Sequence, residues 1–348
     1  MSRPRTPSSA VTSFVVASRY LPVYVAIALL VVVASIWAPA TLSGPALNSI
    51  APFGTFLAIT ALGQMLVIMT GGIDLSVPGT FTLAAVVTVG LAQGADDRLW
   101  PAIAVALALA ALVGLINGIL IGGLGLNALI VTLAVGQIVT GIAIRYYTSE
   151  AIQTPVPAEL SAWTSARFLG VTRTFWVGVA LTVVLIVIFR FTTPGRRFQV
   201  VGANPTASRI AGLRVNLNQM SAYVLASILY GVAGILLAAV LRTVSITIGA
   251  PYLLGPIAAV VIGGASLTGG LASPLSTWAA AFFLAGLNQM MRVMGLPTAL
   301  QFVVFGIVII GGMLVSGDRI IRGVEQVLRE RKPPDVAEAR AVGAGDRM

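Results

Sequence analysis

Asp74 is the one carboxylate of this 348-residue chain that stands between long apolar runs, and it is the first place to look for chemistry. It lies in the stretch Thr70-Gly71-Gly72-Ile73-Asp74-Leu75-Ser76-Val77-Pro78-Gly79. The glycine pair is expected to end one helix, and Asp74 or Ser76 is expected to cap the next, with Pro78 in its first turn. The carboxylate can therefore be a helix cap, or it can contact a solute that passes the broken helix.

Uncharged polar side chains within or beside the apolar runs are the second group of interest. At membrane depth an amide can hydrogen-bond a neutral, hydroxyl-rich solute without the cost of an intramembrane charge. The alternative for any one of these residues is that it only holds neighbouring spans together. With Asp74, the candidates for a translocation pathway are Asn117, Asn127, Gln137, Asn288 and Gln289.

The polar segment 194–216 carries the start and stop signals of a short helix. Asn204 is a good N-cap, and Pro205 suits the first helical position because its missing N–H would be unpaired there. Gly212 can adopt the left-handed conformation that ends a helix. The segment therefore predicts a helix of about two turns, which is more than a connection between two spans requires.

The same segment is basic and contains no acidic residue. A helix of this kind is expected to contact a partner protein; the alternative is that its arginines only mark the cytoplasmic side of the membrane. The residues expected to form the contact are Arg196, Arg197, Asn204, Pro205, Ala207, Arg209, Ile210 and Gly212.

Several residue types are absent, and this narrows the chemistry. The sequence has no Cys and no His, which excludes disulfides, structural zinc sites, haem ligation and imidazole acid–base catalysis. Its only lysine, Lys332, lies in a charged tail, so a phosphate loop of the type G-x-x-x-x-G-K-[ST] cannot form. If ATP drives this protein, another polypeptide must bind and hydrolyse it.

The elements that must position these residues are membrane spans. Apolar residues make up 57% of the chain and charged residues only 9%, and the mean hydropathy is +0.98. These values predict an all-α, polytopic membrane bundle of about ten helices. The spans are expected at about 20–38, 53–70, 76–92, 99–122, 128–147, 174–193, 219–242, 272–294 and 298–316, with a shorter one near 255–267.

Basic residues set the expected orientation. They precede the first span, fill segment 194–216 and follow the last span, so a path with both termini inside places each cluster in the cytoplasm. Arg242 and Arg292 fit this path least well, and each lies close enough to a span end to snorkel. Residues 1–19 and 317–348 are then cytoplasmic tails around a transmembrane domain at 20–316. The net charge of +10 indicates contact with anionic lipid and not nucleic-acid binding.

A short internal similarity predicts an inverted repeat. Gly114-Leu115-Ile116-Asn117 followed by Asn127-Ala128-Leu129 recurs as Gly286-Leu287-Asn288 followed by Thr298-Ala299-Leu300. The copies are five spans apart, and an odd offset makes them face opposite ways. In many transporters the pathway lies between such repeats; chance similarity in a Gly/Ala/Leu-rich sequence is the alternative.

Four stretches in order resemble the permease subunits of bacterial ribose- and xylose-type ABC importers. They are 71–76 (GGIDLS), 202–215 (GANPTASRIAGLRV), 229–239 (LYGVAGILLAA) and 263–270 (GGASLTGG). The resemblance, which covers about 20–316, implies a homodimer, a periplasmic binding protein and a separate ATPase that docks on a cytoplasmic coupling helix, here residues 204–212. Pro78 and the stretch 272–274 depart from the pattern of the family, which makes the identity of the sugar less transferable.

We therefore expect a permease subunit of an ABC importer for a sugar or related polyol in the bacterial inner membrane. It would have no catalytic residue, metal or cofactor of its own, since ATP and Mg would bind the partner ATPase. The alternatives are a secondary transporter or facilitator of a small polar solute, and an ABC permease for branched-chain amino acids. A membrane-embedded enzyme is disfavoured because no pair of titratable groups is placed for acid–base work.

Overall fold

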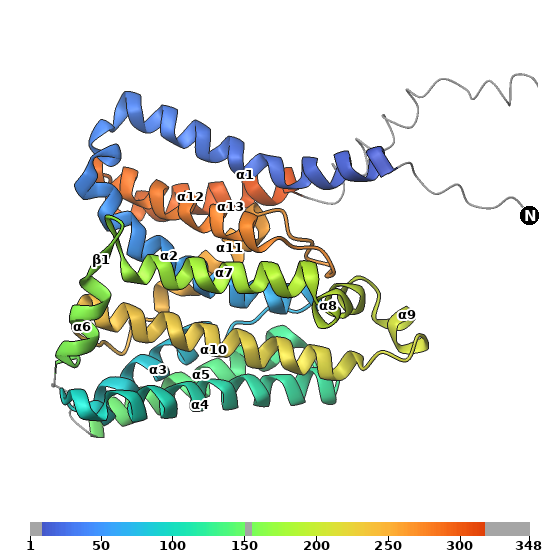
Figure 1. The fold of residues 1–348 in the computed structure, drawn as a ribbon, viewed down its shortest axis with the longest axis horizontal. Coiled ribbons are helices and arrows are strands. Elements are labelled where there is room, and N and C mark those ends of the chain that lie inside the picture. Colours follow the sequence, from blue (N-terminus) through green and yellow to red (C-terminus); the bar gives the residue numbers. More distant parts are fainter. Residues whose placement is uncertain (1–8, 150–154, 317–348) are drawn as a thin grey trace, which may run out of the picture.

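The structure, a computed structural model, describes residues 9–149 and 155–316, which form a helical bundle with one short hairpin (Figure 1). The α-helices are α1 (Ser9–Trp37), α2 (Gly44–Met69), α3 (Val77–Ala92), α4 (Leu99–Gly118), α5 (Ala128–Ser149), α6 (Ala158–Ser165), α7 (Arg173–Phe191), α8 (Thr193–Ala203), α9 (Pro205–Ile210), α10 (Val215–Leu241), α11 (Gly255–Ile262), α12 (Pro274–Val293) and α13 (Thr298–Ser316). The shorter elements are η1 (Pro39–Leu42), η2 (Asp96–Arg98), the π-helical turn η3 (Ile119–Gly123), η4 (Ala250–Tyr252), and the paired strands β1 (Arg167–Phe168) and β2 (Val171–Thr172). The predicted all-α membrane bundle is confirmed.

All ten apolar runs expected from the sequence contain a helix, and the one expected near 255–267 ends as a helix at Ile262. Within the described residues, six helical segments are long and apolar enough to cross a bilayer. They are Tyr20–Trp37, Gly44–Met69, Asp96–Gly123, Ala128–Ser149, Arg173–Phe191 and Val215–Leu241. Shorter apolar helices lie at Val77–Ala92, Ala250–Ile262 and Ala299–Gly312, and α12 covers the run expected at 272–294.

The first helix is longer than the expected span and includes part of the segment 1–19, whose assignment as a cytoplasmic tail stays a prediction. Helix α1 begins at Ser9, because no Pro or Gly stands between Ser9 and Leu21 to stop a helix that grows back from the first span. The expected C-terminal tail, 317–348, lies outside the described residues.

The two ends of the bundle differ in construction. Helix α6 and the hairpin cover one end, and α8 and α9 cover the opposite end (Figure 1). Helix α4 starts at the α6 end, where the Glu159 N–H donates to Asp96 Oδ1 at 2.9 Å. Helix α12 starts at the α8 end, because the preceding segment, 263–273, contacts Gly202. The two copies of the predicted repeat therefore lie on helices that run in opposite directions; the repeat itself stays a prediction.

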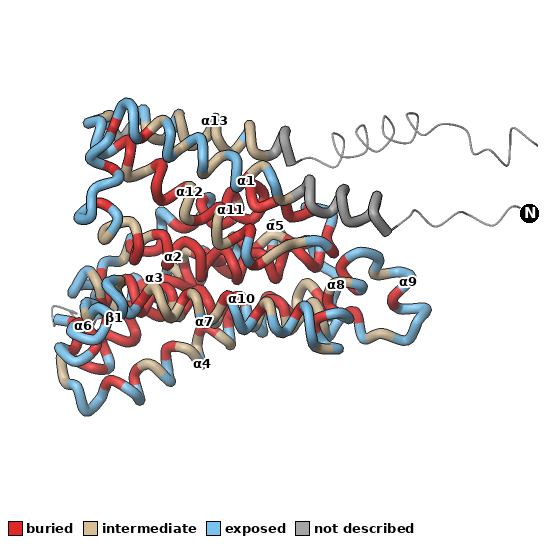
Figure 2. Tube along the Cα trace, turned by 45° about the horizontal axis from the view of Figure 1, so that its top comes forward, coloured by how far each residue is buried: buried red, intermediate tan, exposed pale blue. Residues whose placement is uncertain are grey.

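Helices α2, α3, α10 and α12 supply most of the buried core, and α1 lies at its edge (Figure 2). In the apolar window of α2, 94% of the residues are buried, against 11% in that of α1. Glycines permit the closest helix contacts. A Cβ at Gly63 would overlap the Tyr230 ring, and a Cβ at Gly114 would overlap the Tyr223 carbonyl oxygen. These contacts bring α2 and α4 against α10, so that a polar cluster forms where the three helices meet.

Candidate functional site

The predicted short helix is present as α9, and its cap is the expected one. Asn204 Oδ1 accepts a hydrogen bond from the Ala207 N–H at 2.9 Å, and Pro205 is the first helical residue. Gly212, with a φ of +78°, follows the last turn and donates its N–H to the Arg209 carbonyl at 3.0 Å. The capping residues read from the sequence therefore define both ends of α9.

Helix α9 exposes one large apolar side chain. Ile210 is 85% exposed, more than any other large hydrophobic residue of the described chain. Ser208, on the opposite side of the helix, is buried and donates its hydroxyl to the Val200 carbonyl of α8 at 3.2 Å. The helix is therefore held to α8 by its inner face, while Ile210 points to solvent, as an interface side chain would.

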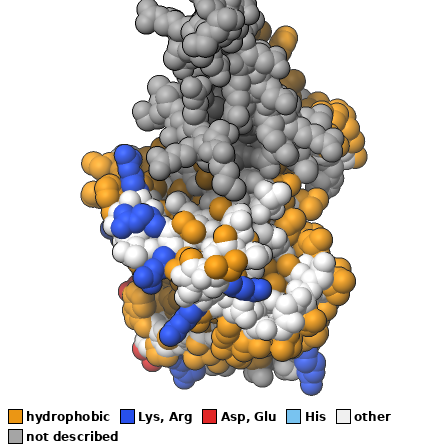
Figure 3. All heavy atoms as spheres, turned by 90° about the vertical axis from the view of Figure 1, so that its right-hand side faces the viewer, with side chains coloured by type: hydrophobic (Ala, Val, Ile, Leu, Met, Phe, Trp, Pro, Cys, Tyr) orange, Lys and Arg blue, Asp and Glu red, His pale blue; other side chains and the backbone are white. Residues whose placement is uncertain are grey.

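Basic residues surround this end of the bundle. Arg196, Arg197, Arg209 and Arg214 are all exposed, and Figure 3 shows arginine side chains spread between apolar ones on this face. Since clusters of basic residues mark the cytoplasmic side of a membrane protein, we assign the α8–α9 end to the cytoplasm and the α6 end to the outside, as the sequence predicts.

The sequence did not predict α8, which joins α9 to the membrane. The Thr192 hydroxyl caps it by accepting from the Gly195 N–H at 3.2 Å. Its apolar side is anchored by Phe198, whose ring centroid lies 5.8 Å from that of Phe189 on α7. Arg196 and Arg197 are on the exposed side of this helix.

The end of α8 makes a close contact with two other elements. A Cβ at Gly202 would overlap the carbonyl oxygen of Met69, the last residue of α2. The Gly270 N–H, in the segment that follows α11, donates to this same carbonyl at 2.9 Å. A Cβ at Gly270 would in turn lie 2.7 Å from Ala203. We call these residues (Met69, Gly202, Ala203 and Gly270) the glycine junction; it joins α8 to α2 and to the segment after α11.

Asp74 lies at the break between α2 and α3 and is fully buried. Its Oδ1 accepts hydrogen bonds from the Ser76 N–H at 2.8 Å and the Ser76 hydroxyl at 2.6 Å. Asn117 of α4 donates to the same hydroxyl at 2.9 Å, and the Leu75 N–H donates to Thr132 of α5 at 2.9 Å. Asp74 and Asn117 are thus brought together through Ser76, which is the N-cap residue of α3; neither Asp74 nor Ser76 makes a side-chain capping bond to that helix.

Gln64 and Tyr230 complete this cluster. Gln64 of α2, in the amide orientation that satisfies both groups, donates to the Asp74 carbonyl at 3.2 Å and accepts from the Asp74 N–H at 3.1 Å. The same amide is within 3.1 Å of the Tyr230 hydroxyl. Among the described residues, Asp74 Oδ2 and Asn117 Oδ1 have no hydrogen-bond partner. Tyr230 lies in the stretch 229–239 that carries the family resemblance, but no role was predicted for it.

The other pathway candidates are dispersed. Asn127 is exposed and caps α5, since its Oδ1 accepts from the Leu129 N–H at 3.0 Å. Gln137 is exposed on α5, and Gln289 is half-buried on α12, away from both cavities described below. Only Asn288 lines a cavity.

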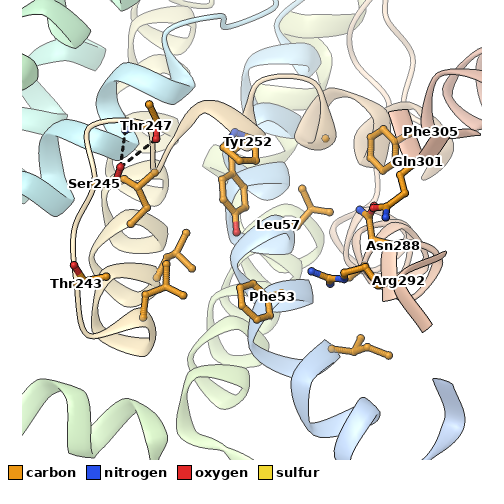
Figure 4. Close-up of a pocket in the computed structure, with 17 residues that line it drawn as sticks. Phe53, Leu57, Thr243, Ser245, Thr247, Tyr252, Asn288, Arg292, Gln301 and Phe305 are labelled. Atoms are coloured by element: carbon orange, nitrogen blue, oxygen red, sulfur yellow. Dashed lines mark hydrogen bonds between the residues drawn. The ribbon is translucent and has the colours of Figure 1, made fainter. Parts of the chain in front are cut away.

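That cavity, the outer cavity, lies at the outer end of the bundle between α2, α10, α11, α12 and α13 and has a volume of about 480 Å³ (Figure 4). Its polar lining comes from Thr243, Ser245, Thr247, Asn288, Arg292 and Gln301, and its aromatic lining from Phe53, Tyr252 and Phe305. A second cavity of about 410 Å³, the inner cavity, lies at the cytoplasmic end and is lined by Arg209, Tyr223 and the glycine-rich segments around Gly72 and Gly123.

Comparisons with known proteins agree with this architecture. Residues 46–313 match the family described as "Branched-chain amino acid transport system / permease component". The chain is 32% identical over 265 residues to a ribose import permease protein of Escherichia coli strain K12, with 75% of this chain and 82% of the relative covered. It is 33% identical over 300 residues to an autoinducer 2 import system permease protein of Klebsiella pneumoniae, with 86% and 87% covered.

A third relative is an L-arabinose ABC transporter permease protein of Azospirillum brasilense, 30% identical over 258 residues, with 73% of this chain and 76% of the relative covered. No solved structure matches the chain. The family model and the relatives extend over most of the bundle, from α2 to α13. The chain therefore belongs to this family of transport permease components, as a multi-pass protein of the bacterial inner membrane.

Proposed function

We propose that the chain is the permease subunit of a sugar importer that is driven by a separate ABC ATPase docked on α8 and α9. The observation that carries the proposal is Ile210, which is exposed at the tip of a capped cytoplasmic helix and flanked by arginines. An exposed apolar side chain with arginines beside it is a combination typical of the centre of a protein–protein interface. The names of the relatives, which include ribose and L-arabinose permeases, favour a sugar over a branched-chain amino acid.

The remaining partners follow from this assignment. ATP and Mg would bind the ATPase and not this chain, in keeping with the absence of a phosphate loop from the sequence. A periplasmic solute-binding protein would deliver the sugar to the outer end, where α6 and the hairpin stand. A second, identical copy would complete the pathway, with membrane lipid around the pair.

In this mechanism the two cavities would lie at the outer and cytoplasmic ends of one pathway. Movement of the ATPase would displace α9 and, through Ser208 and Val200, α8. Because α8 meets α2 and the segment after α11 at the glycine junction, the displacement reaches two helices that line the outer cavity. Backbone segments in direct contact transmit such a shift, because no long side chain lies between them that could absorb it by changing its rotamer.

A secondary transporter would need an ion-binding group within the membrane, and Asp74 is the available carboxylate. Asp74 Oδ1 is occupied by two hydrogen bonds from Ser76 at the start of α3. This arrangement favours a role in holding the broken helix. The ATP-driven mechanism is therefore preferred.

The test is uptake of radiolabelled D-ribose and L-arabinose into proteoliposomes that contain the permease and its ATPase, with the binding protein added. We expect uptake to require ATP. We expect it to fall at least tenfold in the double variant Arg197→Glu, Arg209→Glu, since reversed charge on both α8 and α9 opposes docking of the ATPase. Membrane insertion of the variant is expected to be normal because both side chains are exposed. Uptake that survives ATP depletion but stops when an ion gradient is removed would instead identify a secondary transporter.

A further inference from the structure

The outer cavity contains one charged side chain, Arg292, among the described residues that line it. It is one of the two arginines that fit the charge rule for membrane topology least well. A basic residue at the outer end has no role in setting orientation, so its position calls for another explanation.

Arg292 lies in the cavity without a partner in the described part of the chain. In Figure 4 its guanidinium is drawn between Phe53 of α2 and Asn288 of α12. No hydrogen bond or ion pair joins it to another described residue, and the other lining side chains are uncharged. The cavity therefore has a positive potential that an anionic ligand group would neutralise.

The groups next to Arg292 are suited to hydroxyl recognition. Asn288 stands four residues earlier on α12 and so on the same face of the helix. Gln301 donates its amide N–H to the Leu296 carbonyl at 2.8 Å, which holds the amide in place and leaves its oxygen as an acceptor. An amide can bind both the donor and the acceptor of a sugar hydroxyl.

The opposite wall adds hydroxyls and a fixed aromatic ring. Ser245 and Thr247 lie 3.1 Å apart, oxygen to oxygen, in the segment between α10 and η4. Tyr252 stacks on Phe81, with ring centroids 4.6 Å apart, so its position is defined by the core. The volume of about 480 Å³ is in the range of small-molecule sites and accommodates a monosaccharide.

We infer that the outer cavity binds a hydroxyl-rich solute that also carries a carboxylate, namely a sugar acid, and that Arg292 is its specificity-determining residue. The guanidinium holds the carboxylate through two parallel N–H bonds, which a neutral sugar does not match in charge. Asn288, Gln301 and the Ser245–Thr247 pair bind the hydroxyls. This inference rests on the proposed import function and names the substrate class of the same pathway.

The test compares binding of D-ribonate and D-ribose to the purified permease in lipid nanodiscs by saturation-transfer NMR, at low and at high salt. We expect D-ribonate to bind about tenfold or more tightly than D-ribose, the difference that charge-assisted hydrogen bonds produce. Arg292→Gln is expected to remove this preference, and Arg292→Lys to retain part of it because the charge remains.

The matched control is Arg242→Gln, which removes the other of the two arginines that fit the charge rule least well; Arg242 does not line the cavity, although its neighbours Leu241 and Thr243 do. This variant is expected to bind both probes like the wild type. Equal affinity for the two probes, loss of the preference in Arg242→Gln, or an unchanged preference in Arg292→Gln would overturn the inference. ATP-driven uptake of D-ribose or L-arabinose without uptake of D-ribonate would also overturn it and would leave the proposed function intact.

Discussion

Replacement of Ile210 by Asp is expected to weaken binding of the ATPase about thirtyfold and to reduce ATP-driven uptake at least tenfold. Ile210 is the most exposed large apolar side chain of the described residues, and a central interface residue of this kind contributes about 2 kcal/mol or more to binding. A carboxylate in its place would be buried without a partner on docking. Binding can be measured by surface plasmon resonance with the permease in nanodiscs, and uptake in proteoliposomes.

The control for this experiment is Ile210→Leu, which keeps an apolar side chain of the same volume at the tip of α9. It is expected to bind the ATPase nearly as well as the wild type. Both variants should unfold at the wild-type temperature, because a fully exposed side chain contributes little to the stability of the bundle. Wild-type uptake in Ile210→Asp would show that the ATPase docks elsewhere.

Replacement of Gly202 by Val is expected to separate ATPase binding from transport. Its side chain would overlap the Met69 carbonyl oxygen, which already accepts the hydrogen bond of the Gly270 N–H. Such overpacking costs about 1–3 kcal/mol and must displace α8, α2 or the segment after α11. Since α9 is unchanged, the ATPase is expected to bind within about threefold of wild type, while uptake falls at least tenfold.

Gly141→Val is the matched control, because a Cβ at Gly141 of α5 meets no atom within 4 Å. It is expected to transport normally. The amount of folded Gly202→Val is checked by size-exclusion chromatography, and uptake is expressed per folded protein. If Gly202→Val transported at the wild-type rate, the glycine junction would have no part in coupling.

Local signals in the sequence predicted the ten helical runs and both ends of α9. Each is encoded by neighbouring residues: apolar runs define the helices, and Asn204, Pro205 and Gly212 define the ends of α9. The same reasoning correctly placed Pro78 in the first turn of α3, after the break at Gly71 and Gly72. Rules of this kind need no knowledge of tertiary contacts.

The sequence analysis predicted neither helix α8 nor the start of α1. Both segments are too polar for a span, and a search for spans does not find them. Helix α8 is stabilised by its contact with α7 through Phe189 and Phe198, and the sequence does not show this tertiary contact. In the first helix, residues 9–19 simply lack a stop signal.

The sequence did not show which of the polar pathway candidates are buried. Gln137 on α5 and Asn127 just before it are both exposed, while Asn117 near the end of α4 is fully buried beside Ser76. Which face of a helix meets the core depends on its rotation, and α4 and α5 are so uniformly apolar that the sequence does not define it. Arg292 was expected only to snorkel, and it lines the outer cavity because helices far apart in the sequence meet around it.

The most direct test of the central claim is the location and protection of α9. The sequence has no Cys, so Thr206→Cys introduces a single thiol on the exposed first turn of α9. We predict that a membrane-impermeant maleimide labels it in inverted vesicles and not in right-side-out ones, and that added ATPase prevents the labelling. Labelling from the outside, or unimpeded labelling while the bound ATPase drives uptake, would contradict the proposal that this helix receives the force for transport.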